Sequence, residues 1–124
     1  MRPKNRHQLY SSHTITADEN SAVQKCRHRG MILDIIVTAV TDTPSVVFTI
    51  QSKDYPDGTT YTNLLLSAAV TGTGTTRLII YPGCVAVANS ILNQPMPMYW
   101  RLFSDGTWGG TDGITYQVYV TQLD

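Results

Sequence analysis

The sequence predicts an all-β protein: an antiparallel two-sheet sandwich of jelly-roll or immunoglobulin-like type, with six to eight strands and an extended basic N-terminal arm. Three observations support this fold class. Apolar and polar residues alternate with a period of two over several short segments. The composition is rich in residues typical of strands and turns, with 17 Thr, seven Tyr and nine Gly. After residue 30 the chain is poor in Lys, Arg and Glu, the residues that usually fill surface helices.

The clearest strands flank a short turn around Pro44. The strand before the turn is apolar on nearly both faces, which predicts a central position in its sheet; the residues of one face are Leu33, Ile35, Val37 and Ala39. The strand after the turn places Val46, Phe48 and Ile50 on a single face. A Pro-Asp-Gly turn at residues 56–58 then reverses the chain.

The later part of the chain supplies the remaining strands. We expect them at residues 61–70, 77–81, 99–103 and 114–123, and the last alternates regularly between a core face and a wet face. The Thr-Gly repeat at 71–75 predicts a turn.

Irregular segments and short strands complete the chain. Residues 84–98 predict a long ordered loop with one helical turn at 85–89, and residues 104–113 a Gly-rich loop. Short strands are possible at 14–16 and 22–26.

The domain organisation follows from length and charge. At 124 residues the chain forms one core. Residues 1–29 are expected to form a basic arm with room for short edge strands, and residues 30–124 the β-sandwich. Residues 1–30 carry six Lys and Arg and two acidic residues, which gives a charge of +4. The remaining residues carry three Lys and Arg and seven Asp, which gives a charge of −4. A basic arm on an acidic body favours contact with an acidic partner surface or nucleic acid, with a solvated, partly mobile terminus as the equal alternative.

Cysteine spacing and hydropathy indicate whether the chain holds a metal, a disulfide or a membrane-spanning segment. Cys26 and Cys84 lie 58 residues apart without a CxxC motif, so free thiols are favoured over one disulfide and no metal site is expected. The apolar runs are too short for a membrane-spanning helix, and the basic N-terminus has no apolar segment typical of a secretory signal. We therefore expect a soluble chain that is not exported and has no membrane partner.

Motifs for catalysis or cofactor binding are not found. The chain has no GxSxG, P-loop, GxGxxG, HExxH or EF-hand pattern, so we expect no enzyme, catalytic residue or cofactor. Asp34 interrupts an apolar strand; an outward position at a sheet rim is favoured over a buried pair with Arg77 or Arg101. Because the folded body is acidic and its Tyr residues alternate with core positions, a protein partner is favoured over nucleic acid.

The order of several short motifs resembles that of small structural proteins of tailed bacteriophages. The segments are Leu-Asp-Ile-Ile-Val-Thr-Ala-Val at 33–40, Val-Val-Phe-Thr-Ile-Gln-Ser-Lys-Asp at 46–54, Thr-Arg-Leu-Ile-Ile-Tyr-Pro-Gly at 76–83 and Met-Tyr-Trp-Arg at 98–101, followed by the terminal strand. The resemblance covers about residues 30–123. Residues 1–29 have no counterpart in it, and the loop at Trp108 is enlarged, so the mode of attachment is not carried over.

The resemblance implies a virion protein, most directly a decoration or cement protein that binds the outer surface of the major capsid protein shell and stabilises the head. It would be made in the host bacterial cytoplasm and reside on the capsid surface, as a homo-oligomer and most simply a trimer. The side chains expected at the partner interface are Arg2, Lys4, Arg6, Arg27 and Arg29 in the arm, and Tyr55, Met96, Met98 and Trp108 in the loops. The alternatives are another virion subunit of neck, tail or fibre, and a carbohydrate-binding sandwich using Trp100, Trp108 and Tyr119.

Overall fold

The computed structural model describes residues 3–54 and 58–124, apart from the side chain of Lys4, and within these residues it contains ten strands and no helix. Sheet A has the strand order β1 (Pro3–Ile15), β10 (Gly113–Leu123), β4 (Gly30–Thr41), β7 (Gly74–Ile80) and β8 (Ile91–Leu92). Sheet B has the order β2 (Glu19–Asn20), β9 (Tyr99–Thr107), β5 (Ser45–Lys53) and β6 (Tyr61–Leu66), and β3 (Gln24–Lys25) also pairs with β9.

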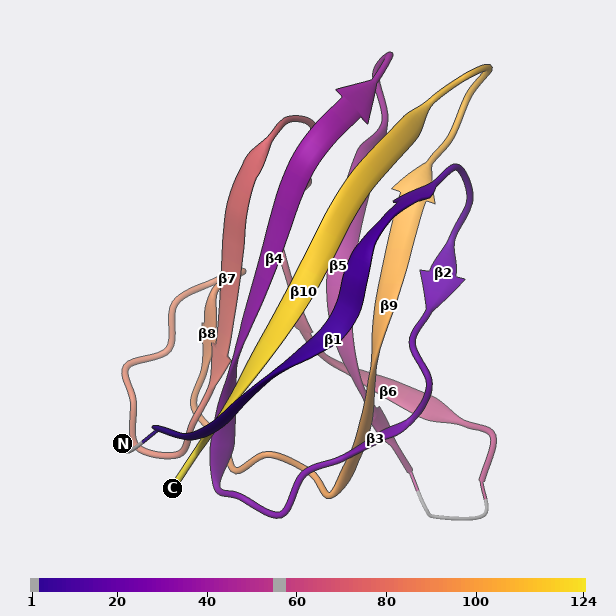
Figure 1. The fold of residues 1–124 in the computed structure, drawn as a ribbon. Helices are drawn as coiled ribbons and strands as arrows, with labels where there is room; N and C mark the ends of the chain where they lie inside the picture. Colours follow the sequence, from indigo (N-terminus) through magenta and orange to yellow (C-terminus); the bar gives the residue numbers. More distant parts are fainter. Residues whose placement is uncertain (1–2, 55–57) are drawn as a thin grey trace.

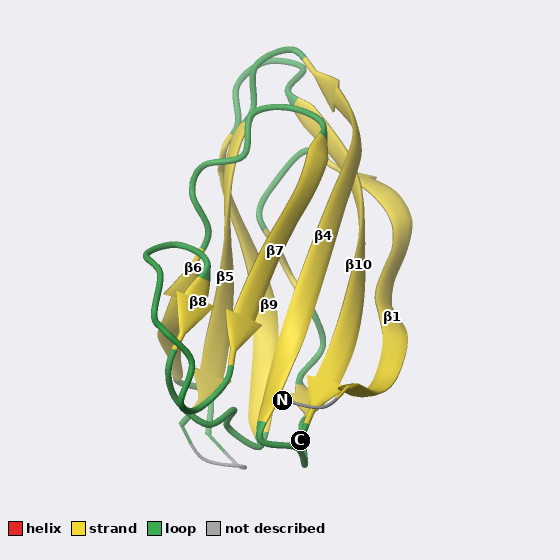
Figure 2. Cartoon of the chain, turned by 90° about the vertical axis from the view of Figure 1, so that its left-hand side faces the viewer, coloured by secondary structure: helices red, strands yellow, loops and turns green. Residues whose placement is uncertain are grey.

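The two sheets lie face to face, with sheet A nearer the viewer in Figure 1 and the two layers seen from the side in Figure 2. All strand pairs are antiparallel except β7 and β8. The predicted all-β class with two packed antiparallel sheets is confirmed. The predicted count of six to eight strands is wrong, because three two-residue strands and β1 add to the long ones.

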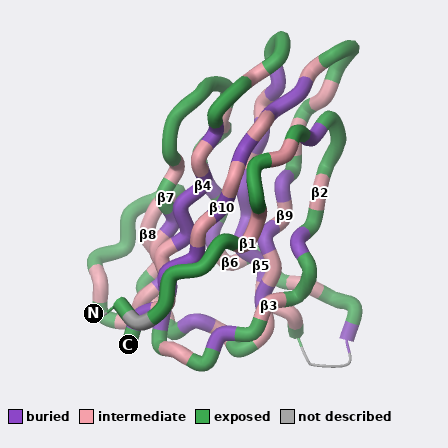
Figure 3. The backbone as a smooth tube through the Cα atoms, viewed as in Figure 1, coloured by how far each residue is buried: buried purple, intermediate pink, exposed green. Residues whose placement is uncertain are grey.

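The core fills the space between the sheets, where the inward residues of β4, β5, β9 and β10 meet (Figure 3). As predicted, Val46, Phe48 and Ile50 are fully buried, and β4 is central, lying between β10 and β7. The inward residues of β10 are also fully or almost fully buried: Ile114, Tyr116, Val118 and Val120. Ala39 is exposed, because a register shift between Thr115 and Tyr116 ends the alternation of β4 early.

Several boundaries differ from the predictions. The short strand expected at 14–16 is the end of β1, which pairs with β10 from Pro3 to Ile15. β9 extends beyond residue 103, its expected end, to Thr107, so the first part of the expected Gly-rich loop belongs to the strand. β6 ends at Leu66, and only a single bridge, between Val70 and Val46, continues its pairing.

The helical turn expected at 85–89 is not formed. The backbone N–H groups of Ser90 and Ile91 both donate to the carbonyl of Val87, and Asn89 has a φ of 64°, which makes this segment a turn that leads into β8. Cys26 is buried, Cys84 is partly buried, and both are free thiols.

Candidate functional site

β3 and the segment that joins it to β4 lie at the end of the sandwich where both chain termini lie (Figure 1), and they carry three of the sequence's basic residues. Lys25, Arg27 and Arg29 are all exposed there. Backbone hydrogen bonds from Cys26 N to Met98 O (2.7 Å) and from Met96 N to Arg29 O (2.8 Å) join this segment to the chain that enters β9. We call the surface formed by Lys25, Arg27, Arg29 and Met98 the basic end.

The two predicted methionine anchors have different environments. Met98, whose carbonyl accepts from Cys26 N, is 51% exposed, whereas Met96 is 7% exposed and belongs to the core cluster. Met98 therefore offers the basic end an apolar contact and Met96 offers almost none. Of the other predicted interface residues, Arg2, Tyr55 and the side chain of Lys4 lie outside the described residues.

Trp108, the remaining predicted anchor, lies at the opposite end of the sandwich, after the end of β9. Its indole N–H donates to Asp18 Oδ1 (2.8 Å), and Gly106 N donates to the same oxygen (2.9 Å). These two bonds, the backbone one first, hold the pKa of Asp18 below its ordinary value. A Cβ on Gly106 would lie 2.5 Å from the Trp108 ring, so this glycine is needed for the ring to pack there.

Carboxylates also cross-link the other loops at this end. Asp112 accepts hydrogen bonds from the backbone N–H of Thr43 and of Gly109, and Asp42 accepts one from the Thr111 hydroxyl. We call this surface the acidic end; its carboxylates are Asp18, Asp42 and Asp112, which make these loop contacts, and Asp105 near the end of β9. The two ends therefore give the sandwich opposite charge along its long axis.

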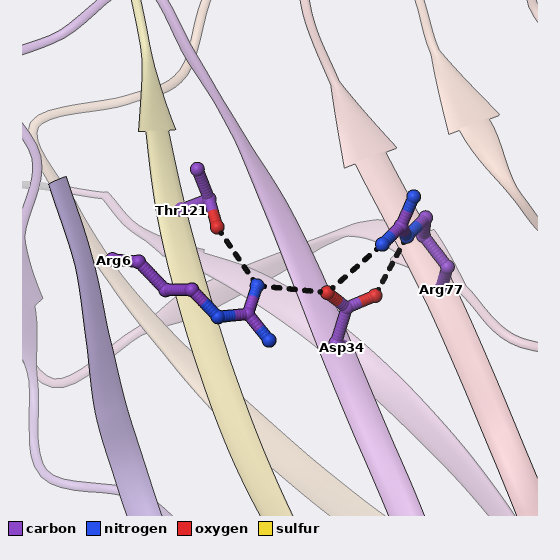
Figure 4. Close-up of polar contacts among 4 residues, drawn as sticks. All are labelled: Arg6, Asp34, Arg77 and Thr121. Carbon is purple, nitrogen blue, oxygen red and sulfur yellow. Dashed lines mark hydrogen bonds and ion pairs between the residues drawn. The ribbon is translucent and has the colours of Figure 1, made fainter. Parts of the chain in front are cut away.

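Asp34 forms the most strongly bonded charged group on the outer face of sheet A (Figure 4). Its carboxylate accepts from Arg77 Nε (2.7 Å) and Nη2 (3.2 Å) and from Arg6 Nη1 (3.2 Å), and Arg6 also donates to the Thr121 hydroxyl (3.1 Å). The side chain of Asp34 is 4% exposed, while those of Arg6 and Arg77 are 51% and 59% exposed. Two half-exposed arginines therefore cover one buried carboxylate.

The electrostatics of this cluster correct the prediction for Asp34. Burial opposes ionisation of the carboxyl, but the hydrogen bonds and charges of Arg77 and Arg6 outweigh it and hold its pKa below the ordinary value. Asp34 faces outward, as favoured from the sequence, but the expected place at a sheet rim is wrong, because β4 is central and side chains from its neighbours bury the carboxylate. The alternative of a pair with Arg77 is confirmed, and the second partner is Arg6 and not Arg101.

A second polar network joins β1 to sheet B through His13. Its Nδ1 lies 2.9 Å from the Ser11 carbonyl and its Nε2 2.6 Å from Glu19 Oε1. Since a carbonyl and a carboxylate only accept, a protonated ring is the form that donates to both. Desolvation lowers the pKa of His13, yet the bonds to Glu19 and Ser11 outweigh it, so the pKa is raised.

The same carboxylate connects to the core. The Tyr116 hydroxyl donates to Glu19 (2.8 Å) and lies 2.9 Å from the Ser104 hydroxyl, and Tyr116 is fully buried. The Tyr10 hydroxyl is buried without a hydrogen-bond partner in the described chain; desolvation and the charge of Glu19 raise its pKa to about 12. Sequence reasoning missed this network, although the placement of His13 six residues before the only glutamate was a signal.

The three aromatic residues considered for a sugar platform do not lie together. Trp100 is 2% exposed in the core, Trp108 lies at the acidic end, and Tyr119 lies on the outer face of sheet A beneath the Arg6 guanidinium at 4.9 Å. A platform made of these three is therefore wrong.

Within residues 3–54 and 58–124 we find no cluster of three His, Cys, Asp or Glu side chains able to hold a metal, and no pocket. The same residues include no helix long and apolar enough to cross a membrane. Comparison of the chain with protein-family models, with curated proteins and with solved structures gave no match.

Proposed function

We propose that this chain is a bacteriophage virion structural protein that binds the outside of the major capsid protein shell as a decoration protein and stabilises the head. It carries no catalytic step in this role. A cement protein acts by burying surface across the seams between capsid subunits, and many copies multiply a modest contact. The resemblance of residues 30–123 and the two-sheet fold are compatible with such a role.

The basic end is the observation that carries the proposal. Lys25, Arg27 and Arg29 lie in the segment that is hydrogen-bonded to the chain entering β9, where Met98 is exposed, and the acidic end lies at the other end of the sandwich. A negatively charged shell surface would attract the first end and repel the second, which orients each copy before contact. Met98 then supplies apolar area at the centre of the contact.

The basic end is held in shape before any partner binds. Arg29 lies over the Tyr81 ring at 5.6 Å and Lys25 over the Tyr99 ring at 5.7 Å. His28 Nδ1 lies 2.8 Å from Asp124 Oδ1, so the histidine binds the side-chain carboxylate of the C-terminal residue. Pre-ordered cationic side chains lose less entropy on binding. A trimer at a local threefold position of the shell is the arrangement that we propose from capsid geometry.

The test is co-sedimentation with undecorated heads assembled from the major capsid protein of the same virus. Arg27→Gln together with Arg29→Gln should weaken saturable binding about tenfold, because two charged contacts of about 0.7 kcal/mol each are lost. The matched control, Thr71→Asp with Thr73→Asp, changes the net charge by the same amount at exposed positions away from the basic end and should bind as the parent does.

Point variants are preferable to an N-terminal truncation. Removing residues 1–12 would delete most of β1, whose Leu9 and Tyr10 pack against the core. Binding that the double glutamine variant leaves undiminished would exclude the basic end as the contact. Absence of binding by the parent chain would contradict decoration and favour a neck, tail or fibre position, or a sugar ligand.

A further inference from the structure

The edge of the sandwich at which β1 and β2 lie is closed by little backbone pairing. In the described part of the chain β1 pairs only with β10, and β2 only with β9, through the two pairs Glu19–Ser104 and Asn20–Phe103. Three register irregularities interrupt the pairing of β1. Figure 1 shows that β1 turns directly into β2, so the edge strands of the two sheets follow one another here. Side-chain contacts between β1 and β2 therefore contribute to closing this edge.

His13 of β1 and Glu19 of β2 make that contact. His13 Nε2 lies 2.6 Å from Glu19 Oε1, and its Nδ1 lies 2.9 Å from the Ser11 carbonyl oxygen. The same Glu19 oxygen accepts from the Tyr116 hydroxyl at 2.8 Å. The His13 ring packs against the rings of Tyr10 and Tyr116, with a centroid separation of 4.8 Å in each case. We call the pair of His13 and Glu19 the clasp.

The protonated ring of His13 makes both of its hydrogen bonds, and the neutral ring makes one. A neutral imidazole has a single N–H group, whereas carbonyl and carboxylate oxygens only accept. If that N–H donates to Glu19, the lone pair of Nδ1 faces the Ser11 carbonyl; if it donates to Ser11, the lone pair of Nε2 lies 2.6 Å from a carboxylate. Loss of the proton therefore removes one bond and the positive charge that attracts Glu19.

The two tyrosines that face the ring stay neutral while the histidine titrates. Desolvation and the charge of Glu19 raise the pKa of Tyr10 to about 12. Burial also raises the pKa of Tyr116 above its ordinary value. Neither phenol therefore supplies a charge to the clasp near neutral pH.

The nearby carboxylates leave the clasp without a second cation. Asp18, in the turn between β1 and β2, has a pKa below its ordinary value because Gly106 N and Trp108 Nε1 donate to it. Asp105 of β9 interacts with Asp18 and is exposed. Among the described residues no Lys or Arg forms an ion pair with Glu19. His13 is therefore the cation that closes this edge.

We propose that the clasp is a pH switch: protonated His13 holds β1 to β2, and loss of its proton raises the population of a state in which residues 10–19 are open. Although burial opposes it, the bonds to Glu19 and Ser11 raise the pKa of His13, so the clasp is complete below about pH 6.5 and is lost as pH rises through the folded pKa. Opening ends before Ser21, which is bonded to Leu102 by N–H to O (2.8 Å) and by its hydroxyl (2.9 Å). The inference does not depend on a capsid role, since it uses only contacts within one chain.

Cleavage by a glutamate-specific protease tests this proposal, because Glu19 is the only glutamate of the chain. The protease acts on an open segment, so its rate follows the open population when opening and closing are fast. At each pH the rate is divided by that of a synthetic peptide of residues 13–25, which corrects for the pH dependence of the protease. Between about pH 6 and pH 9 the corrected rate of the parent should rise about fivefold, as expected from the loss of one hydrogen bond.

Two variants and a urea series identify the cause. His13→Gln cannot titrate, so its corrected rate should not depend on pH. His7→Gln is the matched control, an exposed histidine of the same strand, and it should behave as the parent does. Because a local opening exposes little surface, the corrected rate should rise much less with urea than global unfolding does.

Three results would overturn the proposal. The first is a corrected rate of the parent that does not change with pH. The second is a rate in His13→Gln that rises with pH as it does in the parent. The third is a rate that rises with urea as steeply as global unfolding, since the protease would then reach Glu19 only in the unfolded chain.

Discussion

Replacing Arg77 by methionine removes a guanidinium from the buried carboxylate of Asp34 and keeps an apolar side chain over the sheet. The carboxylate, 4% exposed, loses its two hydrogen bonds from Arg77 and retains only the one from Arg6. Breaking a buried pair costs about 3–5 kcal/mol, and the 59% exposure of Arg77 reduces this through solvent screening. We therefore expect Arg77→Met to lower the free energy of unfolding by about 2–3 kcal/mol at pH 7.

Urea denaturation measures this loss. For a slope of about 2 kcal/mol/M the unfolding midpoint should fall by roughly 1–1.5 M. Arg6→Met is the comparison variant, because Arg6 gives Asp34 one hydrogen bond where Arg77 gives two. It should lower the free energy of unfolding by only about 1 kcal/mol.

The pH dependence tests the electrostatic cause. In the parent the pKa of Asp34 lies below its unfolded value of about 3.9, so the ion pairs stabilise the fold above that pH and lose their contribution as pH falls through the folded pKa. The difference between the parent and Arg77→Met should therefore shrink below about pH 4. A difference under about 0.5 kcal/mol at pH 7, or one that stays constant down to pH 3, would refute the reasoning.

The remaining predictions concern the buried network and the Trp108 contact. The pKa of His13 is raised above its ordinary value of about 6.5, so its contribution to the free energy of unfolding is complete below pH 6.5 and is lost as pH rises through the folded pKa. His13→Gln should remove this dependence of stability on pH, measured by thermal unfolding at several pH values. An unchanged pH dependence would exclude the pair with Glu19. Tyr116→Phe should cost about 1–2 kcal/mol in urea unfolding, and a neutral effect would show that its hydroxyl is not bonded as described. Gly106→Ala should displace the Trp108 ring and shift its fluorescence to longer wavelength, whereas an unchanged spectrum would contradict the close packing.

The strands with regular alternation could be predicted from the sequence. In β5 and β10 the inward residues are large and apolar and the outward ones mostly polar, so the period of two identifies both the strand and its core face. β4 is apolar on nearly both faces, and this pattern identifies it as a central strand. The first strand could not be identified in the same way, because residues 3–13 are mostly polar and β1 has three register irregularities. Its place depends on pairing with β10, more than a hundred residues away in the sequence.

The partners of Asp34 could be predicted only in part. The sequence offers Arg77 and Arg101 as partners of a buried Asp34, but the choice between them depends on the strand order. Sheet A places β7 beside β4, with Arg77 directly opposite Asp34, and Arg101 lies in the other sheet. Arg6 reaches Asp34 across β10, which no local pattern indicates. The basic end likewise required the fold, because Arg29 and Met98 are far apart in the sequence.

Thermal disruption of undecorated heads, with and without the purified chain, tests the central claim most directly. If the chain is a cement protein, the temperature at which heads release their contents should rise with added chain and reach a plateau at a fixed ratio of chain to capsid protein. The Arg27→Gln, Arg29→Gln variant should need about tenfold more protein for the same rise. Heads that open at the same temperature at every concentration of the parent chain would contradict the account.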